Sequence, residues 1–178
     1  ADAASADVDA LVIEADLALY EAKRAGRDCV RVFAEAYRRA ARRRRDLGDE
    51  ISEALEEGRF EPFYQPQVEA WTHRLCGLEA LARWRCPRRG VLPPSEFVPV
   101  AEEMDLLHRI DAAVMERVLA DRAAWLAEGL VPPRISVNAS WRRLAADELF
   151  EAVARLDPPA GALSVELTET VFLDDGSD

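Results

Sequence analysis

Cysteine, histidine and aromatic residues are scarce in this chain, and these shortages exclude several classes of protein. The 178 residues include three cysteines (Cys29, Cys76 and Cys86), two histidines and 7% aromatic residues. An odd number of cysteines without a CxxC spacing indicates neither a disulfide framework nor a zinc site. No apolar run approaches the roughly 20 residues of a membrane span, and no charged-then-apolar leader opens the chain. We therefore expect a cytoplasmic protein with no membrane segment in this chain.

Basic residues are also fewer than acidic residues. The chain has 34 Asp and Glu residues against 23 Lys and Arg residues, which gives a net charge of −11. Binding to the phosphates of DNA or RNA, or to anionic membranes, needs clustered Lys and Arg, so we expect none of these partners. A nucleotide held by a few arginines together with metal ions stays compatible with this charge. The hydrophobic content of 49% is that of an ordinary globular protein.

Proline is missing from the first 61 residues and tryptophan from the first 70, so the composition changes near residue 60 and suggests a domain boundary there. Before this boundary, apolar spacing predicts a helix over residues 8–22 that ends at Gly26, and alternation predicts a strand over residues 29–33. A second helix is predicted from about residue 34 to 57. It carries an arginine cluster, which we interpret as the solvated face of a linker helix; docking of a partner or of nucleic acid is the alternative. The cluster comprises Arg38, Arg39 and residues 42–45.

Strand-like and helix-like runs alternate after residue 58, which predicts an α/β domain. A short turn at residues 71–74 makes the first two strands antiparallel, whereas the later connections are long enough for right-handed helical crossovers. The predicted strands are residues 59–68, 75–84, 134–138 and 163–168. The predicted helices are residues 95–104, 108–128 and about 147–156.

Polar side chains occur near the ends of three predicted strands. The two-residue period of a strand places Glu79, Leu81 and Arg83 on one face, while Asn138 and Glu166 each point away from apolar neighbours. A parallel sheet or barrel would bring such strand ends together at one mouth. Two carboxylates and an amide carbonyl suit Mg²⁺ or Mn²⁺, and Arg83 could pair with a phosphate. Ordinary surface groups and a structural ion pair for Arg83 are equally compatible with the pattern alone.

Five motifs in register over about 120 residues resemble the opening half of an EAL domain, whereas the Glu-Ala-Leu tripeptide alone would not be specific. The resemblance implies an incomplete (β/α)8, TIM-like barrel whose first strand is antiparallel. It also implies a cyclic di-GMP phosphodiesterase that produces pGpG with two Mg²⁺ or Mn²⁺ ions in the complete domain. The motifs are FYQPQ at residues 63–67, GLEALARW at 77–84, PSEFVPVAE at 94–102, SVNAS at 136–140 and ELTET at 166–170.

The same resemblance implies a role for each matching residue. The metal ligands would be Glu79, Asn138 and Glu166, and the contacts to the dinucleotide would come from Gln65, Leu81 and Arg83. Glu79 and Glu169 would be the catalytic residues, of which Glu169 steadies a loop over the site.

The first 34 residues resemble the end of a GGDEF (diguanylate cyclase) domain, through the run ADLALYEAKRAGRD at residues 15–28. In that family the positions of Lys23 and Arg27 help to hold GTP, but the GGDEF signature itself is absent, so these would be surface cations here. We therefore expect a GGDEF remnant at residues 1–34, a linker helix at 35–58 and the first half of an EAL domain at 59–178.

The chain starts without an initiator Met and stops after a strand-like run, which predicts that it is a piece of a longer GGDEF-EAL protein. The later Asp-Asp pair and Lys of an EAL domain are missing, because Asp174 and Asp175 follow Glu166 too closely to be that pair. We expect the parent to be a phosphodiesterase and this chain alone to be inactive. The alternative is a degenerate EAL module that binds cyclic di-GMP as a receptor. A homodimer through the EAL domain or the linker helix is a further expectation.

Overall fold

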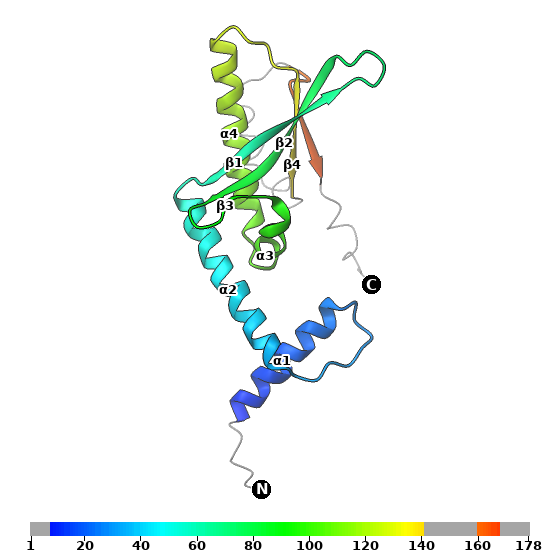
Figure 1. The fold of residues 1–178 in the computed structure, drawn as a ribbon, viewed down its shortest axis with the longest axis vertical. Helices are drawn as coiled ribbons and strands as arrows, with labels where there is room; N and C mark the ends of the chain where they lie inside the picture. Colours follow the sequence, from blue (N-terminus) through cyan, green and yellow to red (C-terminus); the bar gives the residue numbers. More distant parts are fainter. Residues whose placement is uncertain (1–7, 141–159, 168–178) are drawn as a thin grey trace. The chain divides into compact units, whose positions relative to one another are not determined.

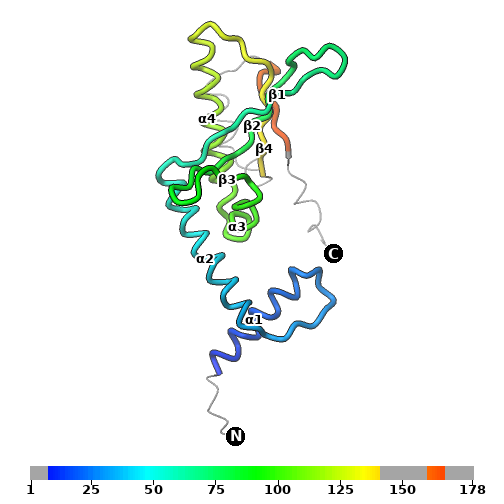
Figure 2. The backbone as a smooth tube through the Cα atoms, viewed as in Figure 1, coloured from blue at the N-terminus to red at the C-terminus, as the bar shows by residue number. Residues whose placement is uncertain are grey.

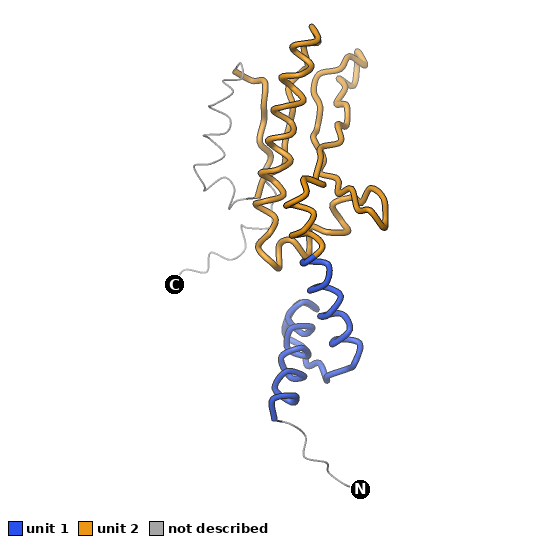
Figure 3. The backbone as a smooth tube through the Cα atoms, turned by 90° about the vertical axis from the view of Figure 1, so that its left-hand side faces the viewer, with its two compact units in different colours: residues 1–49 blue, residues 50–178 orange. Residues whose placement is uncertain are grey.

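The computed structural model describes residues 8–140 and 160–167, and the chain divides into two compact units, residues 1–49 and 50–178 (Figures 1 and 3). The helix predicted at residues 147–156 and the predicted catalytic residue Glu169 lie outside the described residues. No helix in the described part of the chain is long and apolar enough to span a membrane. The elements are, in order, α1 (Val8–Arg24), α2 (Glu35–Glu56), β1 (Phe60–Val68), β2 (Leu75–Cys86), β3 (Gly90–Leu92), the 3₁₀ helix η1 (Pro94–Glu96), α3 (Val98–Glu103), α4 (Leu107–Ala127), β4 (Arg134–Ala139) and β5 (Leu163–Leu167).

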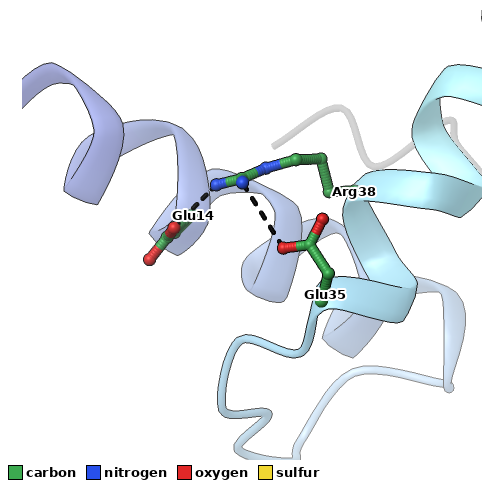
Figure 4. A network of polar contacts seen from close by, with 3 residues as sticks. All are labelled: Glu14, Glu35 and Arg38. Atoms are coloured by element: carbon green, nitrogen blue, oxygen red, sulfur yellow. Dashed lines mark hydrogen bonds and ion pairs between the residues drawn. The ribbon is translucent and has the colours of Figure 1, made fainter.

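Two arginines of the predicted cluster hold the helices of the first unit together. Arg38 pairs with Glu14 of α1 (Nη2–Oε1 2.6 Å) and with Glu35 of its own helix (Nη1–Oε2 3.3 Å), as Figure 4 shows. Arg44 pairs with Glu21 of α1 (Nη1–Oε1 3.2 Å). Such partly exposed pairs contribute at most about 1 kcal/mol each to stability. The interpretation of the cluster as a solvated face therefore does not hold for Arg38 and Arg44, which pair with α1, while Arg39, Arg42, Arg43 and Arg45 are exposed.

The strand predicted at residues 29–33 is wrong, because this segment has no regular secondary structure. Its alternating valines are solvent-exposed, Val30 by 92% and Val32 by 83%. A strand needs a neighbouring strand to pair with its backbone N–H and C=O groups. The described residues of the first unit form helices and loops only, so residues 29–33 have no strand to pair with there.

The second unit is built on a five-stranded sheet in the order β1-β2-β4-β5, with the short strand β3 paired to the end of β2. β1 and β2 are antiparallel, and Gln65 stands opposite Glu79. β4 is parallel to both β2 and β5, and Asn138 stands opposite Glu166. The predicted α/β class, the four predicted strands and the antiparallel first pair are confirmed. β3 was not predicted, because three residues after a turn give no readable alternation.

The helix α4 packs against β1, β2 and β4 on one face of this sheet, here called the helix face (Figure 2). The core of the second unit lies on this face. Its most deeply buried side chains include Trp84 of β2, Phe97 between η1 and α3, and Ile110 of α4. The rings of Phe60, Trp84 and Phe97 pack together, with the centroids of Phe60 and Phe97 5.3 Å apart. The helix predicted over residues 95–104 is divided at Phe97 into η1 and α3. Pro99 explains this division, because proline lacks an N–H and is tolerated only in the first turn of a helix.

Candidate active site

The face of the sheet opposite the helix face carries every predicted site residue that the structure describes. We call it the site face. In a strand, alternate side chains share a face, and residues directly opposite on neighbouring strands also share one. The pairs Gln65–Glu79 and Asn138–Glu166 therefore lie on the site face, because Glu79 stands opposite Ser136, two residues before Asn138. Leu81 and Arg83 follow Glu79 at intervals of two residues on the same strand.

Glu79 and Asn138 are in direct contact across the sheet. The amide Nδ2 of Asn138 donates a hydrogen bond to Oε1 of Glu79 at 3.3 Å, and both residues are half-buried. Glu166 is exposed on the neighbouring strand. The three predicted ligands thus come from three adjoining strands and offer two carboxylates and one amide carbonyl. Within residues 8–140 and 160–167, no group of three or more His, Cys, Asp or Glu side chains is placed to hold a metal ion, so a site here needs the Asn138 oxygen as well.

Arg83, four residues beyond Glu79 on β2, is held by two contacts. Its Nη1 donates to the backbone carbonyl of Ala82 (2.8 Å), and its guanidinium lies over the ring of Phe63 at 5.6 Å from the centroid. The Arg83 guanidinium is thus fixed by a neutral carbonyl and an aromatic ring. Glu61, the carboxylate opposite it in the sheet, pairs with Arg85 instead (Nε–Oε1 2.6 Å). A guanidinium can bind an anion through a planar pair of N–H donors.

A partly buried hydrogen bond fixes the strand that carries Gln65. Tyr64 points to the helix face, where its hydroxyl donates to Oδ2 of Asp121 on α4 at 2.8 Å. Its ring meets that of Trp125 edge-on, with centroids 4.9 Å apart. Burial, followed by the hydrogen bond to Asp121 and the negative charge of that residue, raises the pKa of Tyr64 far above its ordinary value. The native fold therefore keeps Tyr64 protonated and anchors β1 to α4.

We expect the full-length protein to lose stability above about pH 10 more steeply than its Tyr64→Phe variant. The unfolded chain releases the Tyr64 proton near its ordinary pKa, whereas the native state keeps it. The free energy of unfolding should therefore fall with pH, by at most about 1.4 kcal/mol per pH unit from this residue. Urea unfolding of both proteins between about pH 9 and about pH 11 measures the difference. Equal slopes in the two proteins would contradict this reading of Tyr64.

Comparison with known proteins identifies the family. The family model for the EAL domain matches residues 48–178. The chain belongs to the EAL domain family. It is 33% identical over 172 residues to the cyclic di-GMP phosphodiesterase PdeR of Escherichia coli, a match that covers 94% of this chain and 26% of PdeR. It is 31% identical over 169 residues to the bifunctional diguanylate cyclase/cyclic di-GMP phosphodiesterase MucR of Pseudomonas aeruginosa, covering 93% of this chain and 25% of MucR.

This chain thus spans about a quarter of the length of these two curated relatives. The EAL domain is also similar to the solved structure of PaMucR phosphodiesterase in its c-di-GMP complex. That likeness has a TM-score of 0.63 and 29% sequence identity, and it covers 73% of this chain and 54% of the other. The partial barrel predicted from the sequence agrees with this likeness in fold.

A cavity of about 400 Å³ in the EAL domain lies between the helix face and the elements η1, α3 and α4. Leu81 of β2 and Asn138 of β4 line it, but Gln65, Glu79 and Arg83 do not. Its walls are mostly apolar, which suits neither a phosphate nor a cation. We therefore place the candidate active site on the site face, which carries Gln65, Leu81 and Arg83.

Sequence reasoning did not find the two aspartates of α4 that hold the strands of the EAL domain. Asp121 accepts the hydrogen bond from Tyr64, and Oδ2 of Asp111 accepts one from the backbone N–H of Ser140 at 2.8 Å. These contacts join residues 57 and 29 positions apart in the chain. No local spacing signals them. In contrast, the alternation of β1 places Phe63 on the same face as Gln65. The position of the Phe63 ring on the site face could therefore have been predicted.

Proposed function

We propose that this EAL domain hydrolyses cyclic di-GMP to linear pGpG in a reaction that requires divalent cations. One observation carries the proposal: the candidate ligands Glu79, Asn138 and Glu166 share a sheet face with the candidate substrate contacts Gln65 and Arg83. The names of PdeR and MucR, both cyclic di-GMP phosphodiesterases, support it. Leu81, on the same face, would contact the dinucleotide as well.

The residues present fit a hard divalent cation, and we infer two Mg²⁺ or Mn²⁺ ions in the complete domain. Glu79, Asn138 and Glu166 would hold a cation through oxygen atoms, the donors that Mg²⁺ and Mn²⁺ prefer. The hydrogen bond between Asn138 and Glu79 uses the amide nitrogen, so it does not occupy the carbonyl oxygen of Asn138. Two carboxylates beside an anionic phosphodiester would repel it, and a cation between them removes this repulsion. When bound, such a cation would neutralise phosphate charge and make a water molecule more acidic.

The domain's own side chains would bind and orient the substrate. Arg83, fixed by the Ala82 carbonyl and the Phe63 ring, would donate paired hydrogen bonds to a phosphate. Gln65, opposite Glu79, would hold the dinucleotide next to the ligand carboxylate. These non-covalent contacts would hold the scissile phosphate in the geometry that the reaction needs. Glu169, outside the described residues, keeps its proposed role of steadying a loop over the site.

We further propose that residues 1–34 are the end of a GGDEF domain, residues 35–58 a linker helix and residues 59–178 the EAL part. The bifunctional cyclase and phosphodiesterase MucR, which matches 93% of this chain, supports such an order. The exposed arginines of α2 stay available for contacts between copies, so a homodimer through the linker helix or the EAL domain belongs to the same proposal. The setting would be cytoplasmic signalling by cyclic di-GMP.

The test is an assay of the purified full-length protein with cyclic di-GMP and either Mg²⁺ or Mn²⁺, with products separated by chromatography. We expect pGpG to form and its formation to stop when a chelator removes the cation. Tight binding of cyclic di-GMP without cleavage would contradict the phosphodiesterase and support the receptor. A protein that neither binds nor cleaves would contradict both. The same assay on the 178-residue chain tests the expectation that this part alone is inactive.

A further inference from the structure

The end of β4 that carries Asn138 is only half supported by the sheet. On one side, β4 pairs with β2 only as far as Val137, which stands opposite Ala80. On the other side, pairing with β5 continues through Asn138 and Ala139. Asn138 therefore stands where the ladder to β2 has already ended, although its side chain still reaches across to Glu79. Something other than β2 must fix this end of the strand.

Asp111 of α4 supplies that support. Ser140, the first residue after β4, donates its backbone N–H to Oδ2 of Asp111 at 2.8 Å. A backbone N–H that has left a sheet needs another acceptor when it is shielded from water. A carboxylate is the stronger kind of acceptor, because its charge shortens and strengthens the bond. Asp111, Asn138 and Ser140 also line the same apolar cavity, where water competes less for this bond.

We propose that Asp111 is a positioning residue that fixes Asn138 in place for cation binding. Its carboxylate holds the backbone two residues beyond Asn138, while the hydrogen bond to Glu79 holds the side chain of Asn138 itself. Asp111 acts through the β4 backbone and does not contact the cation, because it lies on α4, on the helix face. This inference rests on the proposed function, since it assigns the cation to Glu79, Asn138 and Glu166.

The test compares Mn²⁺ binding by the full-length protein and three variants, measured by calorimetry without the dinucleotide. Asp111→Ala removes the acceptor and should weaken Mn²⁺ binding about 10- to 100-fold, as loss of outer-shell partners does elsewhere. Asp111→Asn keeps an amide oxygen that can accept the Ser140 N–H and should bind within about 3-fold of the unaltered protein. Glu116→Ala, an exposed acidic residue of the same helix, is the matched control and should change nothing.

Unchanged Mn²⁺ affinity in Asp111→Ala would overturn the proposal. An equal loss in Asp111→Asn would also overturn it, because an amide oxygen that can still accept the Ser140 N–H would then make no difference to cation binding. If Asp111→Ala does not fold, amide hydrogen exchange of the unaltered protein decides: protection of the Ser140 N–H without cation is expected, and rapid exchange overturns the proposal. An unaltered protein that binds Mn²⁺ without cleaving cyclic di-GMP would refute the proposed function alone.

Discussion

Replacing Glu79 by glutamine is expected to lower the rate of cyclic di-GMP cleavage by about a thousandfold, which corresponds to about 4 kcal/mol of lost transition-state stabilisation. The change removes the negative charge that would hold a cation but leaves the size of the side chain almost unaltered. The amide oxygen of glutamine can still accept the hydrogen bond from Nδ2 of Asn138. The fold should therefore survive while the proposed chemistry does not. Initial rates of pGpG formation in the full-length protein, at saturating Mg²⁺ or Mn²⁺, measure the effect.

Glu116→Gln is the matched control for Glu79→Gln. It makes the same chemical change on an exposed residue of α4, away from the site face, and should leave the rate within about twofold. A thermal melt of each variant separates loss of chemistry from loss of fold. If Glu79→Gln cleaves cyclic di-GMP as fast as the unaltered protein, Glu79 does not hold a catalytic cation and the assignment of the site face fails.

Much of the site face could be predicted because it depends on local periodicity. Strands repeat every two residues, so the sequence around Glu79 already indicated which side chains share its face, and the short turn at residues 71–74 indicated an antiparallel first pair. The positions of Asn138 and Glu166 followed from the general rule that parallel strand ends meet at one edge. The roles of these residues came from the EAL resemblance rather than from spacing, and they stay predictions until activity is measured.

The features that were not predicted depend on contacts distant in the sequence. The carboxylates of Asp111 and Asp121 could equally belong to an exposed helix face, and only the packing of α4 against the sheet brings them to Ser140 and Tyr64. The strand predicted at residues 29–33 is wrong for a related reason. Its alternation is typical of a strand, but pattern alone does not supply the partner strand that pairing requires.

The helix face and the site face belong to the same strands, so the core and the site are mechanically linked. Trp84 of β2, in the core, directly follows Arg83, on the site face, and Tyr64 directly precedes Gln65. A strand displaced by poor core packing would displace the site residue next to it, because a strand's two faces share one backbone. Core substitutions should therefore reduce activity in two ways, by lowering the folded fraction and by displacing the site residues on the same strands.

Replacing Phe97 by alanine is expected to have the largest effect on stability, a loss of about 3–5 kcal/mol. Phe97 is 0% exposed, and its ring packs against those of Phe60 and Trp84, so its removal leaves a cavity that the rigid sheet cannot close. Because single domains are stable by only about 5–15 kcal/mol, this loss would remove a large share of the protein's stability. Denaturant unfolding of the full-length protein gives the value. Phe97→Leu, with an expected loss of about 1–2 kcal/mol, provides a measurable variant if the alanine form does not fold.

Phe63→Ala is the matched control, because it removes the same side chain from the site face, where Phe63 is 42% exposed. It should cost only about 1–2 kcal/mol in stability, since the side chain is only partly buried, yet it removes the ring under Arg83 and should weaken binding of cyclic di-GMP. The two substitutions would thus distinguish the roles of the two faces. Phe97→Ala should lower the folded fraction, whereas Phe63→Ala should weaken the site of the folded protein. A stability loss from Phe63→Ala as large as that from Phe97→Ala would contradict this division of the sheet.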